Sequence, residues 1–216
     1  MHRFCKGKPP LLVLCCGMLI SIFREVEMRL FFCMIVLWVT PAHADFAKEL
    51  AKAAADRANH SVVYDPSYVS MPYPMGDVPA NTGVCTDVVI RALRVLNVDL
   101  QQRVHEDMKR NFSKYPKIWG LRRTDTNIDH RRVPNLETFL KRRGASLPLT
   151  SDPAAFRPGD IVSWRLPNNL PHIGIVTERK GRSGAFMIAH NIGRGPQVED
   201  MLFDYRIHGH FRWDGR

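Results

Sequence analysis

The chain has 216 residues, and its 31 Lys and Arg against 21 Asp and Glu give a formal net charge of +10. This length is enough for one globular domain with a hydrophobic core. The hydrophobic fraction of 45% excludes a disordered chain. The basic residues lie in scattered pairs without a recognised nucleic-acid motif, so we expect no nucleic-acid partner. A basic exported protein would instead be attracted to anionic polymers such as cell-wall strands.

The N-terminus has the order of a secretory signal. A short charged start at Met28 precedes an apolar run over residues 30–39, and Ala42 and Ala44 form a small-x-small cleavage pattern. We therefore expect residues 1–44 to be a signal peptide, with the true start at Met28. The mature domain, residues 45–216, would be periplasmic or secreted.

A second apolar run covers residues 11–23. Neither run reaches the roughly 18–20 residues that span a bilayer, so we expect no stable membrane span after cleavage. The alternative is an uncleaved membrane anchor.

The first half of the mature chain has helical patterns. Residues 46–59 predict a helix, and the proline-rich residues 60–84 predict a loop. The next helix begins at Cys85, and its apolar positions follow i, i+3, i+4, i+7, i+8 and i+11 along one face: Cys85, Val88, Val89, Ala92, Leu93 and Leu96. Asn81 or Thr82 is expected to cap it.

Two more helices follow, and then the pattern changes to strands. Asp99 is expected to cap a helix over residues 100–112, and residues 134–143 form another, ended by Gly144. Four segments after Pro158 predict strands, with a glycine turn at 181–184: residues 160–165, 172–177, 185–191 and 206–213. Helices first and antiparallel strands second predict an α+β fold.

Cys85 is the candidate nucleophile. The other four cysteines lie in the leader, so the mature domain has one thiol and no internal disulfide partner. In the first turn of a helix, the unpaired N–H groups and the helix dipole favour the thiolate, which predicts a lowered pKa. The alternative is that Cys85 is a small apolar residue on a face that packs into the core.

Two histidines are candidates for the rest of a catalytic centre. A nucleophilic cysteine needs an imidazole to take its proton and a polar group to orient that imidazole. His172 begins one strand-like segment and His190 ends another, so a hairpin between them would place both rings on one face. We expect the Cys85 sulfur within about 4 Å of a His172 ring nitrogen. The alternative for each histidine is a half-buried polar residue.

The motifs around these residues resemble a known family. Pro158-Gly159-Asp160 leads into a strand, and the His172-Ile173-Gly174 run begins the next. This resembles the second half of NlpC-type cell-wall cysteine peptidases of the papain-like clan. The whole mature chain is also similar to a secreted bacterial family known as domain of unknown function 1287.

The resemblance implies a papain-like NlpC-type fold, in which N-terminal helices pack on an antiparallel sheet and the nucleophile begins a helix. It implies that Cys85 is the nucleophile, His172 the base and His190 the orienting residue, with Asn191 as the alternative for that third position. It also implies that Tyr73 contacts the substrate or the oxyanion.

Further candidate substrate contacts are Asp87, Asn191, Asp129 and His130. The last two lie in a dense polar stretch within the enlarged region 99–150, which is either part of the cleft or a solvated loop. The family usually has an aspartate where this chain has Val84. The valine side chain cannot accept a hydrogen bond from a substrate amine. That departure puts a requirement for a free amino terminus in doubt.

These observations predict an exported thiol hydrolase, an amidase or peptidase, that acts on peptidoglycan or a related cell-envelope amide through an acyl-enzyme. We expect a monomer without a cofactor or metal. The alternatives are a thiol acyltransferase and a non-catalytic wall-binding module. A metal site built from Cys85, His172 and His190, or from His208 and His210, ranks last because the usual ligand spacing is missing.

Overall fold

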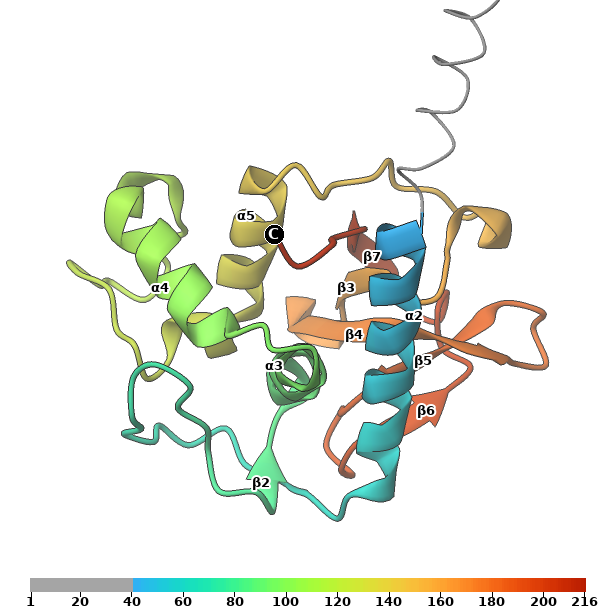
Figure 1. Ribbon diagram of the computed structural model, residues 1–216, viewed down its shortest axis with the longest axis horizontal. Coiled ribbons are helices and arrows are strands. Elements are labelled where there is room, and N and C mark those ends of the chain that lie inside the picture. The colour runs from blue at the N-terminus through green and yellow to red at the C-terminus, as the bar shows by residue number, and fades with distance from the viewer. Residues whose placement is uncertain (1–40) are drawn as a thin grey trace, which may run out of the picture. The chain divides into compact units, whose positions relative to one another are not determined.

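The computed structural model describes residues 41–216, and residues 43–216 form one compact unit (Figure 1). The predicted start at Met28 and most of the signal peptide lie outside the described residues. The expected cleavage point after Ala44 falls within the first described helix, α2 (Pro41–Asp56). Among the described helices, none combines the length and the apolar character needed to cross a membrane.

The order of elements is that of an α+β fold, as predicted. The helices come first: α2, α3 (Cys85–Val95), α4 (Leu100–Arg110) and α5 (Val133–Arg142). Five strands follow: β3 (Ile161–Arg165), β4 (Pro171–Lys180), β5 (Phe186–His190), β6 (Gln197–Glu199) and β7 (Arg206–Phe211). Two short strands before α3, β1 (Val63–Tyr64) and β2 (Thr82–Gly83), pair in parallel.

The five strands form one antiparallel sheet in the order β6-β5-β4-β3-β7. β4 is central, and its first residues reach beyond the end of β5, because the pairing between these two strands begins with Ile175 opposite Ala189. His172 is therefore paired only with Trp164 of β3. This offset leaves the start of β4 open on the side of β5, where the candidate site forms.

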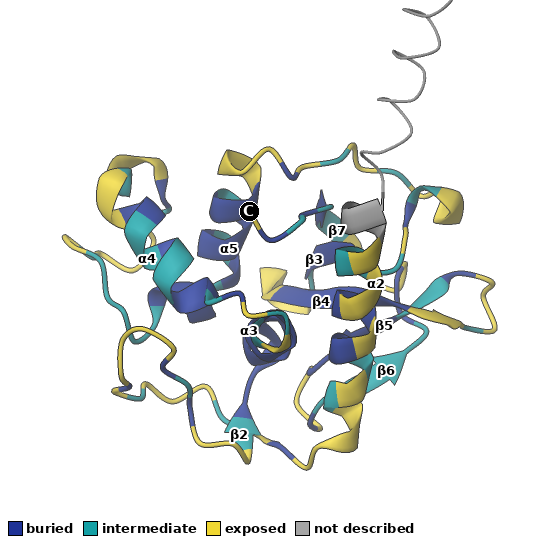
Figure 2. Ribbon diagram, in the orientation of Figure 1, coloured by how far each residue is buried: buried dark blue, intermediate teal, exposed yellow. Residues whose placement is uncertain are grey.

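The two faces of the sheet have separate cores because strand side chains alternate between faces. Ile173, Ile175 and Ala189 face the helices and share a core with α3 and α5. Val176 and Ile188 face the other way, into a smaller core closed by the loops around Phe156 and Leu202. Figure 2 shows that α3 and the central strands are the most deeply buried elements.

The start of α3 is capped differently from the prediction. Val84 is the N-cap residue and has no side-chain cap, so the expected cap by Asn81 or Thr82 is wrong. Instead, Asp87 in the first turn reaches back, and its Oδ2 accepts a hydrogen bond of 2.7 Å from the backbone N–H of Val84. The predicted cap of α4 is confirmed, because Asp99 accepts a bond from the backbone N–H of Gln102.

Candidate active site

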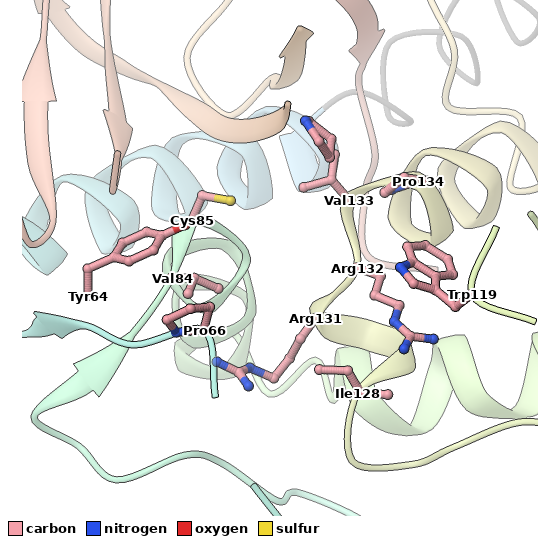
Figure 3. A pocket seen from close by; sticks show the side chains of 11 residues that line it. Tyr64, Pro66, Val84, Cys85, Trp119, Ile128, Arg131, Arg132, Val133 and Pro134 are labelled. Atoms are coloured by element: carbon pink, nitrogen blue, oxygen red, sulfur yellow. The ribbon is translucent and has the colours of Figure 1, made fainter. Parts of the chain in front are cut away.

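Cys85 is the first residue of α3 and lies on the wall of a cavity of about 220 Å³. The side chain is only 6% exposed. Figure 3 shows its sulfur directed toward the space between two walls, with Tyr64 on the same side and Trp119 and Arg132 on the opposite side. The remaining lining residues are Pro66, Val84, Ile128, Arg131, Val133, Pro134 and Pro171.

A buried ion pair fixes the helix that carries Cys85. The guanidinium of Arg131 donates two hydrogen bonds of 3.0 Å to the two carboxylate oxygens of Asp87, and both side chains are buried. The hydroxyl of Thr86 also donates to the backbone carbonyl of Arg131. Asp87 was expected to contact substrate, but its carboxylate is already occupied by Arg131 and by the N–H of Val84. It holds the helix start in place.

The two candidate histidines are in direct contact. Nε2 of His172 lies 3.1 Å from Nδ1 of His190, and the two rings are nearly perpendicular, at 86°. Gly174 makes room for this contact: a Cβ at that position would lie 2.7 Å from Ile188 Cγ2 and 3.1 Å from His190 Cβ. The glycine of the His-Ile-Gly motif is thus required by the close approach of β5, chiefly by Ile188 and the carbonyl of Ala189.

Glu199 of β6 continues the chain of contacts. Its Oε2 lies 2.9 Å from Nε2 of His190, which is ion-pair distance, although the N–H direction is outside that of a hydrogen bond. The Glu199 side chain is 42% exposed, so it forms the solvent end of this contact. Sequence reasoning missed this residue, since a strand of three residues has too little alternation to be recognised.

Burial dominates the proton affinities at the site. It raises the pKa of the Cys85 thiol to about 12, although the backbone N–H groups of Ile173, Thr86 and Cys85 favour the thiolate. The expected lowering of this pKa is therefore wrong: removal from water outweighs the helix terminus. Burial, and to a lesser degree His190, lowers the pKa of His172 to about 3. At rest, both groups are neutral.

Within the described residues no hydrogen bond joins the Cys85 sulfur to His172, so the contact expected within about 4 Å is not present. The backbone N–H of Ile173, the next residue along β4, interacts with the Cys85 sulfur. Pro171, the preceding residue, lines the same cavity as Cys85, while His172 itself is 2% exposed. Such hydrogen bonds are often loose in ligand-free enzymes and tighten when substrate binds.

The other predicted contacts lie outside the wall of this cavity. Tyr73 is 40% exposed and stacks edge-on against His105. Asn191 is buried and donates a hydrogen bond to the carbonyl of Gly83, so it ties the end of β5 to the segment before Cys85. It makes no contact of this kind with His172, whose partner is His190.

Asp129 and His130 belong to a short helix behind the cavity, η3 (Asp129–Arg131), and both are buried. Burial raises the pKa of Asp129 to about 6 and lowers that of His130 to about 4. Sequence reasoning therefore selected the polar residues behind the wall. It missed Trp119 and Arg132, which line the cavity itself, because an isolated tryptophan and an arginine in a basic pair carry no distinctive signal.

The part of the chain that the structure describes contains no group of three His, Cys, Asp or Glu side chains that could hold a metal ion. His210 is buried, with its Nε2 2.7 Å from Asp160. His208 lies 3.7 Å from Glu137. Each therefore has its own acidic neighbour.

The comparisons with known proteins concern most of the chain. The model of a family described as Domain of unknown function (DUF1287) matches residues 51–213. The uncharacterized protein YijF of Escherichia coli (strain K12) is 52% identical over 164 residues, which cover 76% of this chain and 80% of that protein. The chain belongs to the DUF1287 family.

Solved structures with low sequence identity also match this DUF1287 chain. NlpC1 from Trichomonas vaginalis is 16% identical with a TM-score of 0.42, over 81% of this chain and 46% of that one. An N-acetylmuramoyl-L-alanine amidase from Bacteroides uniformis ATCC 8492 is 11% identical with a TM-score of 0.45, over 78% and 99%. The chain thus spans less than half the length of the matched Trichomonas protein.

Proposed function

We propose that this protein is a thiol hydrolase that cleaves an amide bond, with Cys85 as nucleophile, His172 as base and His190 as the residue that positions His172. The observation that carries the proposal is the 3.1 Å contact between the two imidazoles, together with a thiol on the wall of a cavity that Pro171, the residue before His172, also lines. A nucleophile, a base and a polar partner for the base are the parts that such chemistry needs.

Glu199 determines which tautomer each of the two histidines adopts. A carboxylate at Nε2 of His190 favours the tautomer with its proton on Nε2, which leaves Nδ1 as a hydrogen-bond acceptor. Nε2 of His172 then donates to that acceptor. Nδ1 of His172 keeps its lone pair and is the nitrogen that can take the thiol proton.

The steps balance without a further reactant except water. His172 Nδ1 takes the proton of Cys85 as the sulfur attacks the substrate carbonyl. The imidazolium returns that proton to the leaving amine, and a thioester remains on Cys85. Water then attacks the thioester with His172 again as base, which releases the carboxylic acid and restores the thiol. Because Cys85 and His172 are both neutral at rest, the proton passes from the thiol to the imidazole during the attack on the carbonyl and not before it.

For the substrate, we propose an amide of peptidoglycan or of a related cell-envelope polymer. The support is the sequence resemblance to NlpC-type cell-wall peptidases, together with the basic net charge, +10 for the full sequence and +7 for residues 45–216, which favours anionic polymers. A periplasmic or secreted location belongs to the same proposal and rests on the signal-like N-terminus. Acyl transfer in place of hydrolysis would use the same residues with an amine in place of water.

The surroundings of Cys85 favour a second candidate, a non-catalytic wall-binding module. Cys85 is nearly closed off, its pKa is raised to about 12, and no hydrogen bond joins it to His172. A binding module on this fold would keep its function when the thiol is removed.

The test is digestion of purified peptidoglycan by the wild type and by Cys85→Ala, with products read by mass spectrometry. We expect new amine and carboxyl ends from the wild type and none from Cys85→Ala or His172→Ala. His60→Ala is the control, since His60 is exposed and its ring forms an exposed ion pair with Asp56. Identical products from wild type and Cys85→Ala would contradict the proposal, and binding retained without products would support the second candidate.

A further inference from the structure

We propose that Arg132, stacked on Trp119, is a carboxylate-binding subsite in the cavity of Cys85, and that the substrate carries a carboxylate within about one residue of the scissile amide. The statement about the scissile amide rests on the proposed function. The binding of the carboxylate does not, because it can be measured on protein without the thiol.

The geometry of Arg132 suits this role. Its guanidinium carbon lies 4.2 Å from the centre of the Trp119 ring, and both side chains are on the wall opposite Cys85 (Figure 3). Stacking occupies the flat face of a guanidinium and holds the side chain still. The N–H groups lie in the plane and stay free to donate.

The side chain of Arg132 forms no hydrogen bond in the described structure, and its ion-pair neighbour is Asp129. Nη1 of Arg132 is buried and forms no hydrogen bond, and its nearest carboxylate oxygen, Oδ1 of Asp129, is 3.7 Å away, which is too long for one. Asp129 Oδ1 is itself unpartnered. Buried polar groups normally have partners, and Arg132, which lines the cavity without a side-chain hydrogen bond, can meet this need with a ligand carboxylate.

The neighbouring arginine shows the contrast. Arg131 also lines the cavity, but its guanidinium is occupied by Asp87 and by the carbonyl of Ser67. Arg132 is therefore the available cation. The lining contains two arginines and no Asp or Glu. Asp87 already balances Arg131, and Asp129 lies 3.7 Å from Arg132, so Arg132 is the positive charge that a ligand carboxylate can meet from the cavity.

The size of the cavity limits what binds there. Its volume of about 220 Å³ is below the roughly 300–1,000 Å³ of pockets that enclose a whole drug-sized ligand. It therefore suits one residue of a longer chain. Pro66, Pro134 and Pro171 stiffen the walls, and a carboxylate at Arg132 can accept two parallel hydrogen bonds from the guanidinium.

The experiment measures binding to the full mature domain with Cys85→Ala, which cannot turn substrate over. The probes are acetyl-Ala-Glu-amide, which has one carboxylate, and acetyl-Ala-Gln-amide, which has none. The readout is the indole N–H signal of Trp119 by NMR, assigned with Trp119→Phe. We expect a saturating shift with the glutamate peptide and at least about tenfold weaker binding of the glutamine peptide.

Two variants distinguish specific binding by Arg132 from general attraction by the positive charge of the protein. Arg132→Gln is expected to abolish the preference for the glutamate peptide, and Arg132→Lys to weaken it, since lysine keeps the charge without the planar pair of donors. Arg143→Gln is the matched control: Arg143 also stacks on an aromatic ring, that of Phe139, at 5.0 Å, and does not line the cavity. It should keep the preference.

Equal binding of the two peptides, no shift with either, or a preference retained in a folded Arg132→Gln protein would each overturn the subsite. These outcomes differ from failure of the proposed function, which shows as identical peptidoglycan products from wild type and Cys85→Ala. A glutamate preference together with identical products would keep the subsite and reject the hydrolase.

Discussion

His172 and His190 meet through Nε2 of the first ring and Nδ1 of the second, at 3.1 Å, in a buried position at the open end of β4. The other nitrogen of His190 lies 2.9 Å from Glu199. The observed chain of contacts therefore runs from His172 through His190 to Glu199, and the proposed function adds Cys85 at the His172 end.

His190→Ala tests the positioning of the base. Without its partner, His172 can turn or take the wrong tautomer, so we expect kcat to fall by about 10²-fold or more, with little change in KM. Steady-state kinetics on the amide identified from the peptidoglycan digest provide the measurement. A KM effect alone would place His190 in substrate binding.

Glu199→Gln tests whether Glu199 sets the protonation of the histidine pair, and the pH dependence of kcat shows the effect. Glu199 raises the pKa of His190 against the lowering by burial, so its removal makes the histidine pair harder to protonate. We expect the acid limb of kcat to move to lower pH, and kcat on the plateau to fall by roughly tenfold, as for outer partners of other functional histidines. An unchanged acid limb would show that Glu199 does not set this protonation.

The state of the resting thiol can be read by alkylation. With a Cys85 pKa of about 12 and a His172 pKa of about 3, the protein holds no thiolate–imidazolium pair near neutral pH. The rate of alkylation by iodoacetamide should be slow at pH 7 and should rise steadily above pH 9. A plateau reached below pH 7 would show an activated thiolate and contradict the neutral pair.

Asp87→Ala tests whether Asp87 is structural. The substitution leaves the buried guanidinium of Arg131 without its partner, which costs about 3–5 kcal/mol of the free energy of unfolding. Urea unfolding measures the loss. Asp56→Ala is the control, because Asp56 forms an exposed contact with His60, and its midpoint should stay close to that of the wild type. Wild-type stability with weaker substrate binding would return Asp87 to the substrate contacts.

The sequence predicted the elements whose periodic patterns are long. The apolar face from Cys85 to Leu96 predicted α3, and the four segments after Pro158 became β3, β4, β5 and β7. The three residues of β6 were missed, and Glu199 with them. Such a short strand is formed by its pairing with β5 and not by its own pattern.

The electrostatics of the site were the least predictable part. The position of Cys85 in a helix's first turn was correct, but its pKa depends on burial by β4 and by the wall of the cavity, which no local pattern reveals. Asp87 was likewise predicted to contact the substrate, and it forms a buried ion pair. Its partner, Arg131, lies 44 positions away, so the ion pair exists only once the chain has folded.

The central claim is that Cys85 forms a covalent acyl intermediate, and rapid acid quenching followed by mass spectrometry tests it most directly. Wild type mixed with the amide identified from the digest should show a mass increase equal to the acyl group, mapped to the peptide that contains Cys85 and absent from Cys85→Ala. Turnover by Cys85→Ala, at the wild-type rate and without any adduct, would contradict the account.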